Sequence, residues 1–562
     1  MNRFQRIVQS ATLMVFLLLL VCAGFPLPGY LPLDGFLRMD PLAGAAASLS
    51  ARHLIVAFWP ALLVVVFTVV LGRFFCGYLC PMGTTIDLVE SAGARRGRPL
   101  NAPDTWRRWR PVKFHALAFL LGTAALGVSF VFLASPLALI TRFYGNLVMP
   151  VVAAAADGLL GLAADWPEPL RVDGLAMLQV PVHRFAHQWF LVVFFVAVFA
   201  ASRLAPRFWC RYLCPAGAVL ALCSHRPMVR RRVSDACVDC GQCQRQCPMG
   251  AIDDNDPRQT AHGACITCQQ CVAVCPVTAV GFAPGGRGPV VIDGVWADRR
   301  RLLGTGIAGA ATALVSLSGL HHLHGREGLG RILPPELIRP PGSLPEDAFL
   351  ASCLRCGECL SACPTNTLQP LGTAIGITGL FSPVLTPRRG PCEPGCNVCG
   401  WVCPTGAIRS LPLREKTWAK VGTAHILRHK CLAWEFDRRC LVCDEVCPYD
   451  AVELTSVAGI AVGVPVVHEN RCAGCGLCEH HCPVKAQAAI VVEPMGELRL
   501  AGGSYEEKAR SLGLSLVLAK NRTAAGDSGE RSVSVPHADY PAAPGETAAP
   551  DAGDRLPPGF TR

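Results

Sequence analysis

The sequence predicts an α-helical membrane domain of about five transmembrane helices, joined to small α+β domains organised around cysteines. Two observations predict this fold class. The chain of 562 residues is 51% hydrophobic and only 17% charged, whereas a soluble protein has about 25% charged residues. One spacing, Cys-x2–8-Cys-x2-Cys-x3-Cys-Pro, occurs six times and accounts for 24 of the 30 cysteines. The composition therefore indicates membrane helices, and the spacing indicates repeated metal-binding units.

Each cysteine repeat is typical of a site for a [4Fe–4S] cluster. Three closely spaced thiolates can wrap one face of a cubane, and the fourth, which precedes proline, ligates the neighbouring cluster. Structural zinc sites use paired arms and disulfide frameworks suit small secreted domains, so neither explains six copies. No Cys-x-x-Cys-His occurs, so covalently bound haem is not indicated. The repeats predict six [4Fe–4S] clusters in small α+β ferredoxin-like domains. The six sets of cysteines are Cys237, Cys240, Cys243 and Cys247; Cys265, Cys268, Cys271 and Cys275; Cys353, Cys356, Cys359 and Cys363; Cys392, Cys396, Cys399 and Cys403; Cys431, Cys440, Cys443 and Cys447; and Cys472, Cys475, Cys478 and Cys482.

Five apolar segments are candidates for membrane spans, because about 20 residues of helix cross a hydrocarbon core of about 30 Å. They cover residues 8–25, 53–72, 114–135, 188–201 and the Gly- and Ala-rich stretch 302–320. A further apolar stretch, 148–164, carries Asp157, and we expect it to be a periplasmic or interfacial helix.

The distribution of basic residues predicts the orientation in the membrane. Lys and Arg crowd the loop between the second and third segments and the stretch after the fourth, and are sparse in the opposite loops. By the positive-inside rule the N-terminus is cytoplasmic. The net charge of +11 therefore flanks membrane spans, and nucleic-acid binding is the wrong interpretation of it.

The fifth segment follows Arg299, Arg300 and Arg301 and looks like a signal-anchor with twin-arginine character. No small-residue cleavage site follows it, so we expect an uncleaved span that places the last four cysteine repeats in the periplasm. The alternative is a buried helix that leaves all six clusters in the cytoplasm.

These features predict five regions along the chain. A polar tail rich in Ala, Pro, Gly and Glu cannot bury enough apolar area to become ordered. The regions are a four-helix membrane domain at 1–230, a cytoplasmic two-cluster ferredoxin domain at 231–285, a signal-anchor or fifth span at 296–322, a periplasmic four-cluster domain at 340–500 and a disordered tail at 503–562.

A second repeat ends the second and fourth apolar segments. Arg-Phe-Phe-Cys-Gly-Tyr-Leu-Cys-Pro-Met-Gly contains Cys76 and Cys80, and Arg-Phe-Trp-Cys-Arg-Tyr-Leu-Cys-Pro-Ala-Gly contains Cys210 and Cys214. The repetition suggests two related halves whose thiols meet as a four-thiolate site or act as two redox dithiols. The alternative is four small buried cysteines beside helix-ending prolines. Cys22 and Cys223 fit no motif.

Residues 1–285 resemble the NapH/MauN family of polytopic membrane ferredoxins, which have four spans, two Cys-x3-Cys-Pro motifs and a cytoplasmic two-cluster tail. From about residue 296 the chain resembles the NapG/MauM family, in which an export signal precedes four [4Fe–4S] motifs. The resemblance implies a fusion with an accessory electron-transfer role, passing electrons from quinol to a periplasmic reductase or dehydrogenase. The internal arginine signal departs from the family pattern, so the family's nitrate and methylamine roles do not carry over.

Ligand exchange predicts Cys275 as the fourth ligand for Cys237, Cys240 and Cys243, and Cys247 as the fourth for the next repeat. Among the last four repeats, three can pair with four and five with six. The resemblance to four-cluster electron-transfer subunits instead implies three with six and four with five.

A quinone is the natural carrier between the two membrane faces, because about 30 Å of hydrocarbon is too far for one electron hop. His53, His183 and His187 are candidates to exchange quinol protons, and the run His321, His322 and His324 is a candidate to bind metal or haem. Residues of these kinds are more often interfacial anchors.

The leading hypothesis is a membrane-bound polyferredoxin of the bacterial inner membrane that moves electrons between the quinone pool, or a low-potential donor, and a periplasmic redox enzyme. A cytochrome is a further candidate partner. The alternative is a maturation factor that keeps a partner's metal site or thiols reduced. A self-contained enzyme is disfavoured beyond quinol oxidation, because neither a dinucleotide-binding Gly-rich turn nor a P-loop is found.

Overall fold

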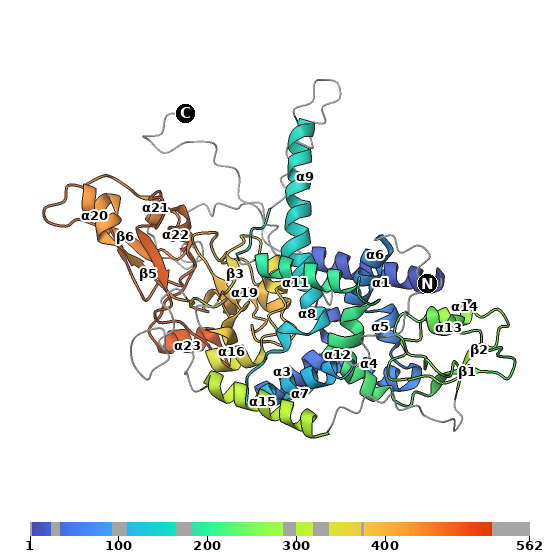
Figure 1. The fold of residues 1–562 in the computed structure, drawn as a ribbon. Coiled ribbons are helices and arrows are strands. Elements are labelled where there is room, and N and C mark those ends of the chain that lie inside the picture. The colour runs from blue at the N-terminus through green and yellow to red at the C-terminus, as the bar shows by residue number, and fades with distance from the viewer. Residues whose placement is uncertain are drawn as a thin grey trace.

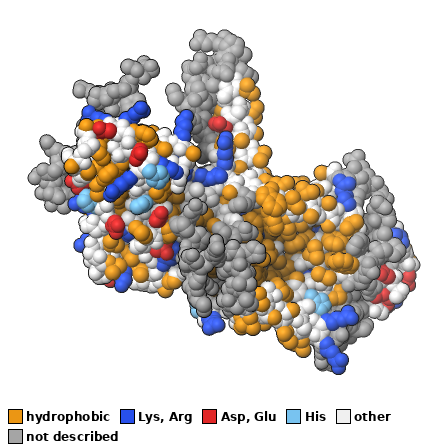
Figure 2. Space-filling view, turned by 60° about the vertical axis from the view of Figure 1, so that its left-hand side comes forward, with side chains coloured by type: hydrophobic (Ala, Val, Ile, Leu, Met, Phe, Trp, Pro, Cys, Tyr) orange, Lys and Arg blue, Asp and Glu red, His pale blue; other side chains and the backbone are white. Residues whose placement is uncertain are grey.

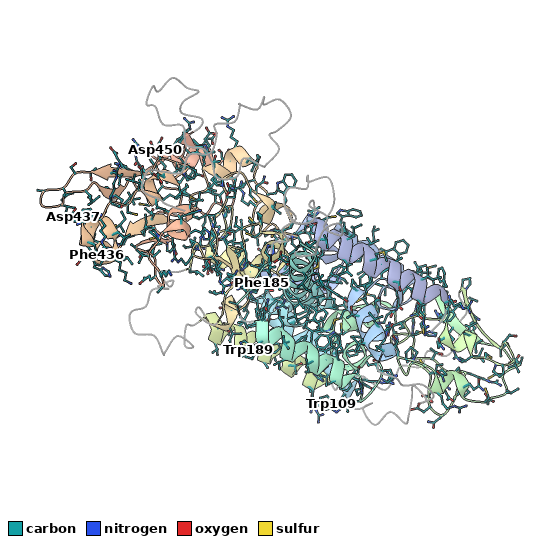
Figure 3. All side chains as sticks on the ribbon, turned by 90° about the horizontal axis from the view of Figure 1, so that it is seen from above. Trp109, Phe185, Trp189, Phe436, Asp437 and Asp450 are labelled. Atoms are coloured by element: carbon teal, nitrogen blue, oxygen red, sulfur yellow. The ribbon has the colours of Figure 1, made fainter. Side chains whose placement is uncertain are left out.

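The computed structural model describes residues 3–23, 34–92, 109–164, 182–186, 188–284, 299–317, 337–372 and 376–519. The molecule is elongated, with a body of helices between two smaller parts rich in short strands (Figures 1 and 3). The part with α13, α14, β1 and β2 lies at one end, and the part with α20, α21, β5 and β6 lies at the other (Figure 1). The two groups of cysteine repeats therefore lie on opposite sides of the helical body.

The helical body has one hydrophobic core, which includes Phe16, Leu42, Phe132 and Phe195. Local capping starts several of its helices. Asp40, for example, accepts hydrogen bonds from the backbone N–H groups of Leu42 (2.9 Å) and Ala43 (3.3 Å), as an N-cap residue does. The α-helices are α1 (Arg3–Cys22), α2 (Gly35–Arg38), α3 (Pro41–Ala51), α4 (Trp59–Leu71), α5 (Phe74–Tyr78), α6 (Pro81–Ala92), α7 (Val112–Ala125), α8 (Pro136–Arg142), α9 (Met149–Ala164), α11 (Gln188–Ala201) and α12 (Pro215–Cys223). The 3-10 and π turns are η1 (Val56–Phe58), η3 (Val131–Leu133), η4 (Phe143–Val148) and η5 (Trp209–Leu213).

Among the described helices, two are long and apolar enough to cross a membrane: Arg3–Cys22 and Pro136–Leu162. Three of the expected spans correspond to shorter apolar helices, Val56–Leu71, Val112–Ala125 and Gln188–Ala201. A helix of 14 residues is only about 21 Å long, which is less than the usual hydrocarbon thickness. The five-span arrangement therefore stays a prediction.

The third and sixth apolar segments differ from expectation. The helix expected over 114–135 ends at Ala125, where Gly127 adopts a φ of 85°, and a new helix starts at Pro136 with Ser135 as its cap. The segment 148–164, expected as a separate interfacial helix, continues the helix that starts at Pro136 through the π turn η4. Its outer part, α9, stands out from the body (Figure 1). The π turn kept the two halves from looking continuous in the sequence.

The expected fifth span forms α15 (Arg299–Leu317). This helix lies along α7 (Figure 1), and small residues bring the two backbones together. A Cβ at Gly122 of α7 would overlap the carbonyl of Gly306, and a Cβ at Gly309 would overlap the carbonyl of Phe119. Helix α15 is not one of the two described helices that are long and apolar enough to cross a membrane.

The cysteine repeats lie in small units closed by two-stranded antiparallel sheets. In the first unit β1 (Val229–Val233) pairs with β2 (Val280–Pro284), which brackets both repeats. In the last unit β5 (Thr423–Ile426) and β8 (Ile490–Glu493) bracket two repeats in the same way, and the other pairs are β3 (Leu368–Pro370) with β4 (Pro383–Leu385) and β6 (Val452–Thr455) with β7 (Val464–Val467). The accompanying helices are α13 (Gln242–Arg245), α14 (Gln270–Ala273), α16 (Glu346–Ser352), α17 (Glu358–Ala362), α18 (Val398–Trp401), α19 (Leu413–Thr417), α20 (Leu432–Phe436), α21 (Val442–Glu445), α22 (Leu477–His481) and α23 (Tyr505–Ser511).

The start of the expected disordered tail is folded. Helix α23 is capped by Ser504, whose hydroxyl accepts from the Glu507 N–H at 3.3 Å. Tyr505, Ala509 and Leu516 are fully buried. The prediction of disorder from 503 is therefore wrong as far as residue 519, because the average polarity of the tail masked these apolar positions; residues 520–562 lie outside the described part.

Candidate functional site

The cysteines of the repeats assemble into sets of four, and we name each set by its first cysteine. Cys265, Cys268, Cys271 and Cys247 line one cavity, which is the ligand exchange that the sequence predicts. Cys243 and Cys275 pack into one small core, which also contains Cys247 and Cys271, and Cys237 lies within electrostatic range of Cys243. The first unit therefore contains a Cys265 set; Cys237, Cys243 and Cys275 belong to the second expected set, which we name the Cys237 set, and its remaining member, Cys240, is exposed.

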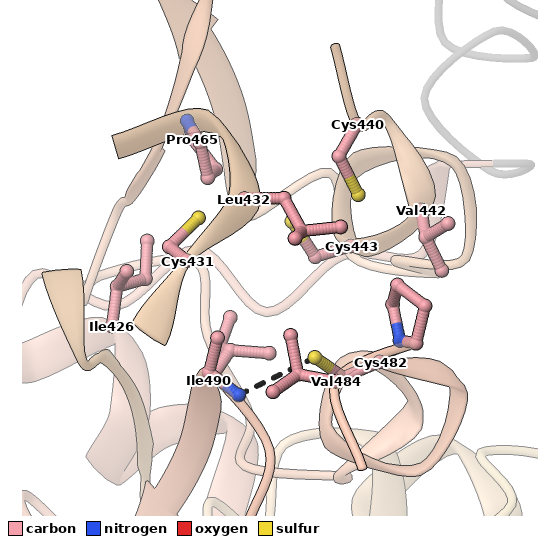
Figure 4. Close-up of a pocket in the computed structure, with 12 residues that line it drawn as sticks. Ile426, Cys431, Leu432, Cys440, Val442, Cys443, Pro465, Cys482, Val484 and Ile490 are labelled. Atoms are coloured by element: carbon pink, nitrogen blue, oxygen red, sulfur yellow. Dashed lines mark hydrogen bonds between the residues drawn. The ribbon is translucent and has the colours of Figure 1, made fainter. Parts of the chain in front are cut away.

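The outer domain pairs the third repeat with the fourth and the fifth with the sixth. One cavity is lined by Cys392, Cys396, Cys399 and Cys363. Another is lined by Cys431, Cys440, Cys443 and Cys482, whose sulfur atoms face a common space (Figure 4). The pairing of three with six and four with five, which the resemblance implied, is therefore wrong. The fourth cysteine of each repeat therefore joins the set of the repeat next to it in the sequence, as Cys363 and Cys482 do.

Two further sets complete the outer domain. Cys359 lies within electrostatic range of Cys353, Cys356 and Cys403. Cys478 is likewise close to Cys472, Cys475 and Cys447. The outer domain thus holds a Cys353 set, a Cys392 set, a Cys472 set and a Cys431 set, each with three cysteines from one repeat and the fourth from its neighbour.

The four outer sets follow one another in a line. Cys359 of the first lies near Cys399 of the second. The backbone N–H of Cys392 in the second donates to the carbonyl of Cys475 in the third at 2.7 Å. Cys478 of the third lies near Cys443 of the last. The order from the helical body outward is therefore Cys353, Cys392, Cys472 and Cys431 sets.

The two ends of this line have different surroundings. Cys356, in the first set, belongs to the hydrophobic core of the helical body. The last set lies beside α20, and Figure 3 places Phe436 and Asp437 at the tip of the molecule. Phe436 is 56% exposed. The Cys431 set is therefore the outer set nearest to the exposed tip of the molecule.

Backbone N–H groups point at the thiols in a recurring way. The N–H of the alanine four residues after a Cys-Pro cysteine donates to its sulfur, as Ala251 does to Cys247 (3.3 Å) and Ala451 does to Cys447 (3.2 Å). The sequence signal Cys-Pro-x-x-Ala could have revealed this pattern. Such bonds stabilise negative charge on sulfur and raise the potential of a bound cluster.

Buried cations beside the outer sets were missed by sequence reasoning. Lys416 is only 6% exposed. Burial lowers its pKa, but the nearby thiols of Cys392 and Cys396 outweigh burial, so the pKa is raised. Arg355 is also buried, and burial lowers its pKa to about 10. Its guanidinium donates to the Ser129 carbonyl at 2.9 Å and so ties the Cys353 set to the helical body.

The thiols fit a metal cluster better than free cysteine chemistry. Burial raises the pKa of Cys353 to about 11 and that of Cys443 to about 12, so these thiols are neutral without a metal. Within the described part of the chain, no three His, Cys, Asp or Glu side chains converge closely enough for a single ion. Four thiols arranged around an apolar space suit a cluster with several irons, and such clusters supply one-electron redox chemistry.

The helical body contacts both cysteine-rich parts directly. At one end, the Tyr78 hydroxyl donates to the Thr267 carbonyl at 3.1 Å, within the Cys265 repeat. At the other end, Ser361 donates to the Asn146 side chain at 2.9 Å, within the Cys353 repeat. The body therefore connects the two groups of sets.

The structure brings some of the other predicted site residues together and leaves others apart. The structure brings Cys76, Cys80, Cys210 and Cys214 together, as described below. His183 makes a 2.8 Å hydrogen bond with the Cys363 carbonyl, which is a structural contact to a cysteine set. His53 is exposed and bonds the Ala51 carbonyl at 3.1 Å. His187, His321, His322 and His324 lie outside the described residues, and Cys22 and Cys223 are half-buried.

Comparison with protein families agrees with these sets. A model described as a 4Fe-4S binding domain matches residues 53–99, 188–234 and 398–418. Two models described as 4Fe-4S dicluster domains match residues 236–280 and 438–486. The fold and the cysteine sets thus define an iron–sulfur, ferredoxin-type electron-transfer protein.

Related proteins narrow this class. The methylamine utilization ferredoxin-type protein MauM of Methylorubrum extorquens is 37% identical over 222 residues, which cover 38% of this chain and 97% of MauM. MauM of Paracoccus denitrificans is 43% identical over 173 residues, covering 29% of this chain and 74% of the relative. The ferredoxin-type protein NapG of Escherichia coli is 36% identical over 167 residues, covering 28% and 71%. The chain belongs to the family of MauM and NapG ferredoxin-type proteins.

Proposed function

We propose that this protein is a membrane-bound polyferredoxin that moves single electrons between the quinone pool, or a low-potential donor, and a redox enzyme outside the cytoplasm. Six [4Fe–4S] clusters, held by the six cysteine sets, carry the electrons. The observation that carries the proposal is the arrangement of two groups of cysteine sets at opposite ends of one apolar helical body (Figure 1).

An exposed apolar surface supports membrane insertion. Figure 2 shows hydrophobic side chains gathered over the middle of the molecule. Leu18 of α1, Leu62 of α4 and Val193 of α11 are between 59% and 65% exposed. Soluble monomers rarely expose a broad apolar area, and lipid is the natural occupant of this one. In this proposal the helical body is a NapH-like membrane part fused to a NapG-like part.

The expected topology follows from this arrangement. The Cys237 and Cys265 sets face the cytoplasm, and the four outer sets face the periplasm. A periplasmic reductase or dehydrogenase, with or without a cytochrome, would meet the Cys431 set at the outer tip. Buried Arg355 and Lys416 compensate negative charge at the outer sets as electrons arrive.

The test is anaerobic reduction of the full-length protein in lipid nanodiscs. Reduced menaquinone or ubiquinone analogues are added, and cluster reduction is followed by visible absorption and EPR, with dithionite as the full-reduction reference. We expect quinol to reduce a fraction of the clusters that dithionite reduces. Clusters that respond to dithionite but stay fully oxidised with quinol would contradict the quinol route and favour a low-potential donor or the maturation role.

A further inference from the structure

The two Cys-x3-Cys-Pro repeats meet in the helical body as reciprocal halves. A Cβ at Gly217, which ends the second repeat, would lie 2.7 Å from the guanidinium of Arg73, which begins the first. In return, the guanidinium of Arg207, which begins the second repeat, lies in van der Waals range, 3.8 Å, of a Cβ placed at Gly83, which ends the first. Each repeat therefore sets its arginine against the terminal glycine of the other, as expected of a pseudo-two-fold pair, and at Gly217 the approach leaves no room for a side chain.

This pairing gathers all four cysteines of the repeats. Cys80 lies within electrostatic range of Cys76 and Cys210. Cys214 lies within range of all three, and Cys210 within range of Cys76. The side chains of Cys80, Cys210 and Cys214 are each at most 8% exposed and belong to the core of the helical body. Every pair among the four is thus close, and we call them the Cys76 set.

Two thiols of the Cys76 set lie at helix N-termini. Cys214 caps α12, and its sulfur accepts from the Gly217 N–H at 3.3 Å. Cys80 immediately precedes α6, and the backbone N–H groups of Met82 and Gly83 bond to it. Helix N-termini stabilise negative charge on sulfur. The repeated Cys-Pro therefore places two thiols where thiolate ligands are favoured.

Of the two buried arginines at the Cys76 set, only one has an anionic partner among the described residues. Arg73 and Arg207 are at most 1% exposed. Arg207 pairs with Asp87, with its Nε 2.7 Å from the carboxylate. Arg73 has no carboxylate partner among the described residues: its Nη1 donates to the neutral Gly263 carbonyl at 3.3 Å, its Nη2 lies 3.8 Å from the Cys76 sulfur, and its Nε has no acceptor there. Burying an unpaired guanidinium is costly, so a negatively charged group is expected at these thiols.

A single iron–sulfur cluster shared by the two halves satisfies these observations. One half alone has two motif cysteines, yet a family model described as a 4Fe-4S binding domain matches both halves. Four thiolates around a cluster carry net negative charge, which would balance Arg73. We propose that Cys76, Cys80, Cys210 and Cys214 ligate a seventh iron–sulfur cluster in the helical body.

The seventh cluster would lie next to the Cys265 set. Arg207 is within electrostatic range of both Cys210 and Cys268, and Cys268 shares the core of the helical body with Cys210 and Cys214. A reduced cluster at the Cys265 set would pass one electron to the cluster at the Cys76 set. The first cluster is then oxidised and the second reduced by one electron, and no covalent bond is made or broken. This relay role rests on the proposed function, whereas the binding claim does not.

The test counts iron and acid-labile sulfide in the anaerobically purified full-length protein. With four irons in each of six [4Fe–4S] clusters, the wild type should contain about 24 irons if there is no seventh cluster, about 28 if the seventh is [4Fe–4S] and about 26 if it is [2Fe–2S]. Cys210→Ala should lose about four irons, or about two if the shared cluster is [2Fe–2S], and retain the other six clusters. Cys223→Ala, a half-buried cysteine on the neighbouring α12, is the matched control and should lose none.

Cys80→Ser is a second variant, chosen because it disturbs the fold less. Oxygen in place of sulfur is nearly isosteric and preserves a hydrogen-bond acceptor at the start of α6. This variant should either lower the iron count by the content of one cluster or change the Mössbauer signal of one cluster. A wild-type count of about 24 irons, unchanged in both variants, would overturn the proposal. So would peptide mapping that finds disulfides among the four cysteines, which would assign redox dithiols. The count needs neither quinol nor a partner, so it separates this claim from the proposed function.

Discussion

At the scale of single residues, the cysteines set where clusters bind, while their neighbours set how readily each cluster is reduced. The potential of an iron–sulfur cluster depends on hydrogen bonds to sulfur, on solvent exposure and on nearby charge. The recurring N–H···S bonds from Ala251 and Ala451 act alike at several sets. Lys416 differs, because it brings a buried positive charge to the Cys392 set.

Replacing Lys416 with methionine should lower the reduction potential of the Cys392 cluster. A positive charge stabilises the reduced state, which carries one more negative charge. Over a separation on the order of 8 Å, the loss is roughly 2 kcal/mol at an effective dielectric constant of about 20, or about 90 mV for one electron. An EPR-monitored redox titration should show one step moving to lower potential by several tens of millivolts.

The control for this substitution is Lys508→Met, because Lys508 is an exposed lysine on α23 in the same domain. Its removal should leave every step of the titration within about 10 mV, since exposed charges are strongly screened. If both variants shift the titration equally, or if neither does, Lys416 does not act on the cluster by its charge.

At the scale of elements, close backbone packing positions α15. Gly309 lies against the Phe119 carbonyl, and Gly122 lies against the Gly306 carbonyl. His115 of α7 also bonds the Thr305 hydroxyl at 3.2 Å. Small residues at a helix contact allow this approach both in membranes and in soluble cores. The contact explains how a weakly apolar helix is held against the body.

Gly309→Leu should separate α15 from α7, because any Cβ there would overlap backbone that cannot move aside. Overpacking of this kind typically costs 1–3 kcal/mol, so the midpoint of thermal unfolding in nanodiscs should fall by several degrees and proteolysis at the ends of α15 should speed up. Gly304→Leu on the same helix is the matched control, since nothing lies within 4 Å of a Cβ there. An equally destabilised Gly304 variant would refute the packing contact.

Elements were predictable from the sequence only where a local signal marked them. Apolar runs located α1, α4 and α11, although not their lengths. The link from α8 to α9 was missed because a π turn at Phe143–Val148 gives no clear period. Helix α23 was missed because Tyr505, Ala509 and Leu516 are sparse in a polar stretch. In both cases the sequence was interpreted over a stretch that included the boundary between two elements, so its average composition did not show where the ordered element lies.

At the scale of the whole molecule, the cysteine sets were predictable, but their pairing in the outer domain was not. The spacing in each repeat fixes which three cysteines share a set, and its Cys-x2-Cys-x3-Cys-Pro part is identical in all repeats. The fourth ligand depends on which repeats the fold brings side by side, as it does for Cys363 in the Cys392 set. The meeting of Arg73 with Gly217 likewise depends on helix packing that no local motif records.

The linear order of the outer sets makes a kinetic prediction. Electrons that enter from the helical body reach the Cys353 set first and must pass the Cys392 and Cys472 sets before the Cys431 set. Cys475→Ala, which removes a ligand of the third set, should therefore isolate the last set. After rapid mixing of the protein in nanodiscs with a membrane-soluble reductant, freeze-quench EPR should find two outer clusters reduced early, with the Cys431 cluster still oxidised.

Cys440→Ala, which removes a ligand of the last set alone, supplies the comparison. Its other three outer clusters should be reduced as fast as in the wild type, because nothing upstream of them has changed. A branched arrangement would predict three early-reduced clusters in both variants, since the Cys431 set would then receive electrons without the Cys472 set. The number of reduced spins at early times therefore distinguishes a line from a branch. It also tests the contacts of Cys392 with Cys475 and of Cys478 with Cys443, on which the line depends.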